Sequence, residues 1–194
     1  VNDEKEFYHC FATSEHGNIF DFVMKIQNLR FGEAVKHLAQ LAGMQPYMFS
    51  KQDEEREKKW KEYQSIFSQY VDFYHSELLK NESYSIARDY LKNRSLTKEE
   101  VKKFKIGYIE KNPNFFEKLK DNYSEQTLVE TGLFYLDEKK KIYVERFRGR
   151  LIFPINNISG QPIALGGRII ENVDYLAKYI NSPETNFFKK GSNL

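Results

Sequence analysis

The C-terminal part of the chain is organised around the stretch Arg146-Phe147-Arg148-Gly149-Arg150-Leu151-Ile152-Phe153-Pro154-Ile155. Its second half begins an apolar run over residues 150–156, which is typical of a buried strand, and residues 162–170 form another such run. Turn-forming residues at 157–160 separate the two runs, so the sequence predicts an antiparallel hairpin. Two further strands are expected over residues 135–144, around a charged turn.

The pattern changes from strands to helices upstream of this sheet. We expect helices near residues 86–93, 114–121 and 124–131, with Gly132 ending the last of them. Another helix should begin at Thr97, which opens a capping box with Glu100. A short strand is expected at residues 106–109.

A long helix is expected immediately before these elements. After a charged stretch at residues 51–59, one helical face carries Trp60, Tyr63, Phe67, Tyr70, Tyr74 and Leu78. An apolar stripe at this spacing is typical of a helix packed on a core. Stacking of bases on its aromatic rings is the alternative. We interpret residues 46–80, which open at Pro46, as a linker followed by a helix that bridges two domains and packs on the second.

The first 45 residues carry signals of their own. A short, aromatic, strand-like stretch at residues 6–11 precedes two helices. Asn18 is placed as the N-cap of the first helix, with Asp21 near the positive end of the helix dipole. Residues 31–39 follow the spacing of an amphipathic helix, and Gly43 is placed to end it.

Composition limits the classes of protein to consider. With 40% apolar and 30% charged residues in 194 positions, the chain has the composition of a soluble protein of one or two domains. It holds neither an apolar run long enough to span a membrane nor a signal-peptide pattern. Its single cysteine, Cys10, fits a reducing cytoplasm. Because the chain does not begin with Met, we expect the true start to lie upstream.

Positive charge is concentrated in the C-terminal third of the chain. Residues 139–190 hold ten Lys and Arg against four acidic residues, a net charge of +6 in a chain whose total is +2. A basic surface on a nearly neutral chain fits phosphate binding. The alternative is an ordinary solvated face.

Several stretches resemble bacterial DNA primases in order and spacing. Tyr8-His9-Cys10-Phe11, His16-Gly17-Asn18-Ile19-Phe20-Asp21-Phe22 and Phe31-Gly32-Glu33-Ala34-Val35 resemble the second half of the family's zinc-binding domain. Ala87-Arg88-Asp89-Tyr90-Leu91 resembles the opening of its RNA polymerase domain. The most specific matches are the stretch at 146–155, Gly166-Gly167-Arg168 and Lys178-Tyr179-Ile180-Asn181-Ser182-Pro183-Glu184-Thr185.

The resemblance implies an α+β fold in three parts. Residues 1–45 would be the C-terminal part of a zinc-binding-like domain, a partial zinc-ribbon-like region with two helices. Residues 46–80 would be the linker and bridging helix. Residues 81–194 would be the N-terminal subdomain of the primase RNA polymerase core, a mixed α/β subdomain with a mostly antiparallel sheet.

The resemblance also implies an activity. Primases are nucleotidyltransferases that synthesise RNA primers for DNA replication from ribonucleotides on a single-stranded DNA template. In the family, a toprim fold that would follow residue 194 holds the catalytic magnesium, and a C-terminal domain contacts the replicative helicase. This chain alone is therefore expected to bind template without polymerising, in the cytoplasm at the nucleoid.

The zinc site departs from the family pattern. Family members have Cys-x-x-Cys where this chain has Cys10-Phe11-Ala12-Thr13, and their first two zinc ligands would precede Val1. Because a neutral hydroxyl is a poor zinc ligand, Cys10 is left as the candidate ligand in this stretch. A free cysteine is the alternative, and His16 would be a substitute donor in the full protein.

The basic residues are the candidates for template binding. The DNA-binding set is Arg146, Arg148, Arg150, Arg168, Lys178, Tyr179 and Lys190. The resemblance itself gives this role to the residues matching Arg168, Lys178 and Lys190. Lys and Arg bind phosphate without reading bases, as a template site requires. Tyr179 would stack on a base or simply pack.

Two details of geometry are expected around these residues. Arg146, Arg148 and Arg150 have the same parity, so in a regular strand their side chains would share one face. The glycine pair before Arg168 permits a close backbone approach or a positive φ, either of which would aim the arginine into a groove.

Two other functions stay open. One is a non-catalytic single-stranded-DNA-binding relative of primases, for which Thr13 is the main support. The other is a structural zinc-domain protein, against which the missing ligands argue. An acidic toprim cluster after residue 194 would separate the enzyme from the binding relative.

Overall fold

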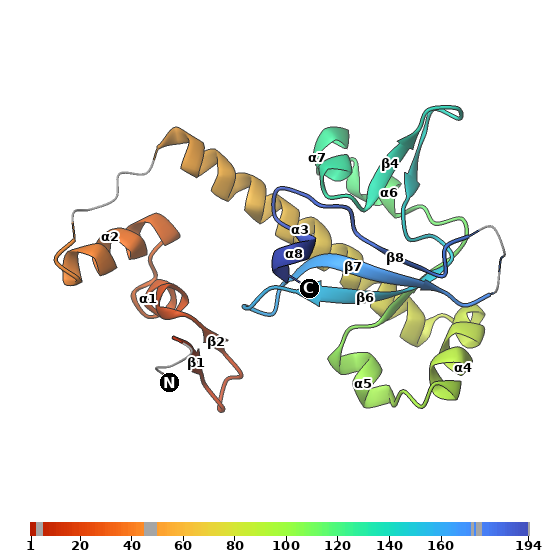
Figure 1. Ribbon diagram of the computed structural model, residues 1–194, viewed down its shortest axis with the longest axis horizontal. Coiled ribbons are helices and arrows are strands. Elements are labelled where there is room, and N and C mark those ends of the chain that lie inside the picture. The colour runs from red at the N-terminus through yellow and green to blue at the C-terminus, as the bar shows by residue number, and fades with distance from the viewer. Residues whose placement is uncertain (3–5, 45–49, 172, 174–175, 194) are drawn as a thin grey trace. The chain divides into compact units, whose positions relative to one another are not determined.

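The computed structural model describes residues 1–2, 6–44, 50–171, 173 and 176–193. The chain divides into two compact units, Val1–Lys59 and Trp60–Leu194, and helix α3 (Lys51–Lys80) runs through the division (Figure 1). The predicted domain limits at residues 45 and 80 stay a prediction. The predicted opening of the linker at Pro46 lies outside the described residues.

The first unit contains a small hairpin and two helices. Its elements are β1 (Tyr8–His9), β2 (His16–Gly17), α1 (Ile19–Gln27) and α2 (Phe31–Leu41). The predicted cap of α1 is confirmed, because Asn18 Oδ1 accepts from the Asp21 amide at 3.1 Å and Asp21 Oδ2 accepts from the Asn18 amide at 2.9 Å. Gly43 ends α2 with φ of +66°. Among the described residues of this unit, only Gly17 and Ala34 are buried, so the unit has little core of its own.

The second unit is built on a four-stranded sheet with the order β3-β6-β7-β8. Its strands are β3 (Gly107–Ile109), β6 (Arg150–Asn156), β7 (Pro162–Ile169) and β8 (Tyr179–Asn181). All three pairings are antiparallel. β4 (Phe134–Asp137) and β5 (Ile142–Glu145) form a separate antiparallel hairpin. The predicted strands and the mostly antiparallel sheet are therefore confirmed.

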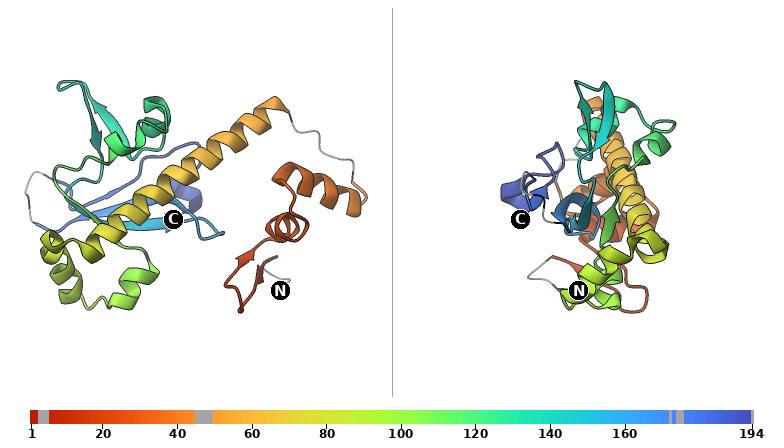
Figure 2. Two further views of the ribbon diagram at one scale, coloured as in Figure 1. Left: turned by 180° about the vertical axis from the view of Figure 1, so that it is seen from behind. Right: turned by 90° about the vertical axis from the view of Figure 1, so that its right-hand side faces the viewer.

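Helices surround this sheet. They are η1 (Glu82–Tyr84), α4 (Ser85–Asn93), α5 (Lys98–Lys103), α6 (Phe115–Leu119), α7 (Glu125–Glu130) and α8 (Lys190–Asn193). From Trp60 onward α3 runs along the sheet, with α4 and α5 to one side and α6, α7 and the β4–β5 hairpin to the other (Figures 1 and 2). The aromatic stripe on α3 is core, as predicted: Phe67 and Tyr70 are 0% exposed. A second cluster joins Leu91 of α4 and Val101 of α5 to Leu151 of β6.

A buried carboxylate connects three of these elements. Glu145, at the end of β5, is 2% exposed. Its Oε2 accepts hydrogen bonds from the hydroxyls of Tyr70 at 2.9 Å and Tyr74 at 2.7 Å, both on α3. Its Oε1 accepts from the Phe115 amide, at the start of α6, at 2.7 Å. Burial raises the pKa of the Glu145 carboxyl, although the hydrogen bonds that it accepts oppose this shift.

Candidate nucleic-acid interface

Four of the predicted DNA-binding residues lie at one end of the sheet. Arg150 begins β6, Arg168 lies near the end of β7, and Tyr179 begins β8 directly after Lys178. The strand register places Arg168 opposite Tyr179. Arg150 Nη1 donates to the carbonyl oxygen of Lys178 at 3.3 Å, which ties β6 to the chain entering β8.

Arg168 is held by two tyrosine rings. Its guanidinium carbon lies 4.9 Å from the ring centre of Tyr179, and its Nη1 donates a hydrogen bond to the Tyr179 hydroxyl. The ring centre of Tyr90, from α4, lies 5.2 Å from the same carbon. Sequence reasoning missed Tyr90, because one aromatic residue on a short amphipathic helix gives no sign of which strand it meets. Tyr179 is 60% exposed, so part of its ring faces solvent.

The glycine pair before Arg168 serves close packing. Neither glycine has a positive φ, so the first of the two predicted explanations holds and the second does not. A Cβ on Gly167 would lie 2.6 Å from Cδ1 of Phe147 and 3.2 Å from Cδ of Arg150. The missing side chain therefore lets the buried Phe147 ring press against β7 beside Arg168.

The three arginines of residues 146–150 do not share a face, and that expectation is wrong. Residues 146–149 form a turn between β5 and β6, so the alternation of a regular strand does not apply. In this turn Arg146 Nε donates to the Gly132 carbonyl at 2.7 Å, and its guanidinium lies 5.3 Å from the ring centre of Tyr135. Arg150 is 5% exposed, and burial lowers the pKa of its guanidinium.

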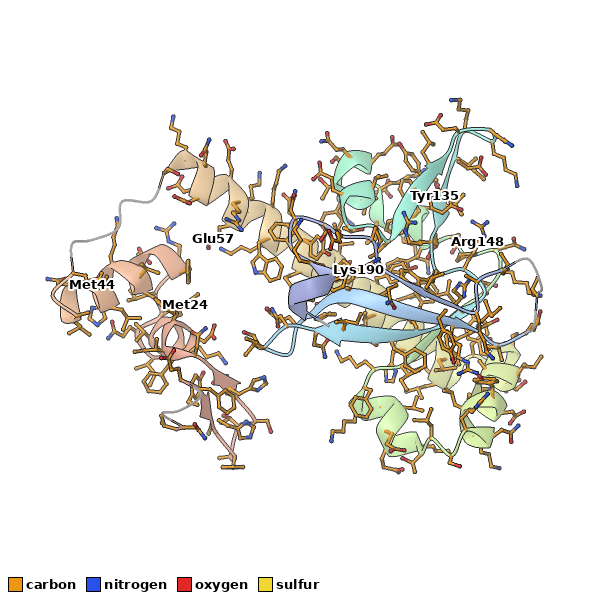
Figure 3. All side chains as sticks on the ribbon, viewed as in Figure 1. Met24, Met44, Glu57, Tyr135, Arg148 and Lys190 are labelled. Atoms are coloured by element: carbon orange, nitrogen blue, oxygen red, sulfur yellow. The ribbon has the colours of Figure 1, made fainter. Side chains whose placement is uncertain are left out.

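Arg148 is the exposed arginine of this turn. Its Nη1 donates to the Tyr135 hydroxyl at 2.9 Å, and Figure 3 shows the two residues on neighbouring segments. Arg148 also lines a cavity of about 270 Å³ with Ile169 and Ile170, at the end of β7. This cavity connects the turn to the end of the sheet that carries Arg168.

The two lysines of the set belong to different segments: Lys178 precedes β8 and Lys190 begins α8. Lys178 is exposed and forms no ion pair with any residue in the described ranges. Lys190 begins α8, and its amide donates to Glu184 Oε1 at 3.2 Å. Figure 3 shows Lys190 away from Arg148 and Tyr135. Glu184 is thus a helix-capping group here.

Two family models match the chain. Residues 73–194 match the DNA primase catalytic core, N-terminal domain, and residues 1–55 match the CHC2 zinc finger. The chain belongs to the bacterial DNA primase family. Within the described part of the chain, no helix combines the length and apolarity that a membrane crossing needs.

Curated primases match the whole of this chain. It is 37% identical over 202 residues to a DNA primase of Buchnera aphidicola and 36% identical over 197 residues to one of Clostridium acetobutylicum. Each match covers 100% of this chain but 33% and 32% of the relative, so the chain spans about a third of the length of these primases.

Solved primase structures share the fold. The DnaG primase catalytic domain bound to ssDNA matches with a TM-score of 0.63 and 30% identity, over 70% of this chain and 42% of that one. The Aquifex aeolicus primase, with its zinc binding and RNA polymerase domains, matches with a TM-score of 0.60 and 30% identity, over 100% of this chain and 45% of that one.

The zinc finger match raises the question of whether this primase chain can hold zinc. Cys10 is a free, partly exposed thiol, and hydrogen bonds from Thr13 lower its pKa. The ring of His16 stacks on that of His9 with 5.9 Å between centres, and its Nδ1 lies 3.2 Å from the Ser14 carbonyl. No three metal-ligating side chains come together among the residues described, so these residues do not form a zinc site by themselves.

Proposed function

We propose that this chain is the template-binding part of a DNA primase, and that single-stranded DNA lies across the end of the sheet where β6 begins and β7 ends. The observation that carries this proposal is the direct contact of Arg168 and Tyr179 at that end, where Lys178 precedes Tyr179 in the sequence. The similar catalytic domain bound to ssDNA supports the kind of ligand.

The chemistry of these residues suits a template that must be held in any sequence. Lys178 and Arg168 would contact phosphates, and such contacts release counterions without reading the bases. The exposed ring of Tyr179 would stack on a base, which is worth about 1–3 kcal/mol and tolerates any base. Arg148 would extend the same surface past the cavity at the end of β7.

Arg168→Ala and Lys178→Ala test this surface. Each variant should weaken binding of a labelled oligothymidylate in fluorescence anisotropy, and each should lower the slope of log affinity against log salt by roughly 0.7, the value for one phosphate contact on a single strand. Lys139→Ala removes the same charge from the β4–β5 turn and should leave the slope unchanged. Native slopes in both binding variants would exclude this surface.

For the whole protein, we propose primer synthesis from ribonucleotides on DNA in the cytoplasm. Magnesium and the replicative helicase would act through segments that follow the family pattern after residue 194. Template-directed incorporation of ribonucleotides by the product of the complete gene, with magnesium present, tests this.

Thr13, which stands where the family has a zinc-binding cysteine, favours a second candidate. This candidate is a primase relative that binds single-stranded DNA without polymerising. Failure of the complete gene product to incorporate ribonucleotides, together with intact DNA binding, would select it over the enzyme.

A further inference from the structure

The environment of Arg168 contains one residue that the template surface does not explain. Tyr90 lies on α4, yet the guanidinium of Arg168 lies over its ring as well as over the ring of Tyr179. Leu151 and Arg168 are paired in the sheet and share a face, and α4 packs on Leu151. The packing of α4 therefore brings the ring of Tyr90 onto Arg168.

The two rings leave Arg168 with limited ways to bind a ligand. The two ring centres lie 5.2 Å and 4.9 Å from the guanidinium carbon, within the range of cation–π attraction. Nη1 is bonded to the Tyr179 hydroxyl, and Nε is buried without a partner in the described structure. Among the described residues Nη2 forms no hydrogen bond, so it is the nitrogen left to donate to an acceptor such as a phosphate oxygen.

The ring of Tyr90, and not its hydroxyl, is the part of the side chain that interacts with Arg168. The hydroxyl is buried and has no hydrogen-bond partner within the described residues. A buried hydroxyl without a partner is unfavourable, so it does not account for the presence of a tyrosine here. The ring, in contrast, packs on the cluster around Leu91 and faces Arg168.

We infer that Tyr90 is a positioning residue of the template site. This inference rests on the proposed function and deepens it. The ring of Tyr90 fixes the plane of the Arg168 guanidinium, so that Arg168 binds phosphate while the exposed ring of Tyr179 is left for a base. Tyr90 itself does not touch the DNA.

A double-mutant cycle tests this role by anisotropy with a labelled oligothymidylate. Tyr90→Leu keeps apolar bulk but removes the ring, and it should weaken binding roughly three- to tenfold, which is the range of a partly desolvated cation–π contact. The same change in an Arg168→Ala background should have no further effect, because the group that Tyr90 positions is gone. Tyr90→Phe keeps the ring and should bind DNA with native affinity.

A matched control separates positioning from general damage. Tyr123→Leu removes another half-buried tyrosine ring of this unit, one whose hydroxyl bonds to Ser65 on α3, and it should leave DNA binding unchanged. Circular dichroism melting identifies any variant that fails to fold. For Tyr90→Leu, the native and Arg168→Ala backgrounds are compared at a temperature where both are folded.

The outcomes distinguish this inference from the proposal on which it rests. Equal weakening by Tyr90→Leu with and without Arg168, or no weakening at all, would overturn the positioning role while leaving the template surface in place. Native affinity in Arg168→Ala would also overturn the positioning role, and native affinity and salt slope in both Arg168→Ala and Lys178→Ala would overturn the template surface as well. The role is supported if Tyr90→Leu weakens binding only when Arg168 is present and if Tyr90→Phe binds with native affinity.

Discussion

Removing the Glu145 carboxylate should cost this chain much of its stability. In Glu145→Ala the hydroxyls of Tyr70 and Tyr74 and the amide of Phe115 lose their acceptor in the core. A buried donor left without a partner costs about 1–3 kcal/mol. We expect a loss of about 3–5 kcal/mol, which is at the lower end of the sum over the three donors, because water entering the new cavity can accept some of these hydrogen bonds.

Urea unfolding followed by circular dichroism measures this loss. A loss of this size corresponds to a fall in the melting temperature of roughly 10–15 °C for a chain of this length. Glu138→Ala is the control, since Glu138 is exposed in a surface ion pair with Lys141, and its loss should change stability by less than about 0.5 kcal/mol. A loss below about 1 kcal/mol in Glu145→Ala would refute the assignment of these three bonds as a stabilising network.

The same carboxyl gives a test in pH. Burial raises the pKa of Glu145 in the folded chain above its unfolded value. The stability gained from the protonated acid is therefore fully present below the unfolded pKa, near 4.3, and is lost as pH rises through the folded pKa. Native stability relative to Glu145→Gln, which cannot titrate, should be greater at about pH 4 than at about pH 7. A constant difference over this range would contradict the raised pKa.

Three further substitutions test local packing and local electrostatics. Gly167→Ala should destabilise the chain by about 1–3 kcal/mol in thermal melts, since the new Cβ would lie 2.6 Å from Phe147, whereas Gly166→Ala, with its nearest atom at 3.4 Å, should cost less. Thr13→Ala should raise the pKa of the Cys10 thiol towards its ordinary value and slow alkylation by iodoacetamide near pH 8. Equal stability of the two glycine variants, or unchanged alkylation, would count against these accounts.

Local signals in the sequence predict most of the elements. The stripe on α3 and the cap at Thr97 depend on spacing along one segment, and both appear as expected. The prediction that the three arginines share one face failed, because side chains of the same parity share a face only inside a regular strand. Gly149 adopts φ of +70°, a conformation that favours glycine and occurs in turns, so its presence between Arg148 and Arg150 was the available sign of a turn.

The site itself was only partly predictable. Arg168 and Tyr179 are identified by motifs, but their direct contact depends on the register between β7 and β8. Tyr90 reaches Arg168 across 78 positions of the sequence. The pattern of one helix contains no information on such a contact, because it follows from which face of the sheet α4 covers.

The unequal lengths of the strands also affect how the sheet opens. β3 pairs with β6 only at residues 150–152, and β8 pairs with β7 only at residues 166–168. The β6–β7 hairpin is thus flanked on both sides at its open end, and no described strand flanks it near its turn. A free hairpin would fray first at the open end, but here local fluctuations should begin at the turn. Because Arg168 lies in the flanked part of the hairpin, we expect the binding end to stay ordered when the turn opens.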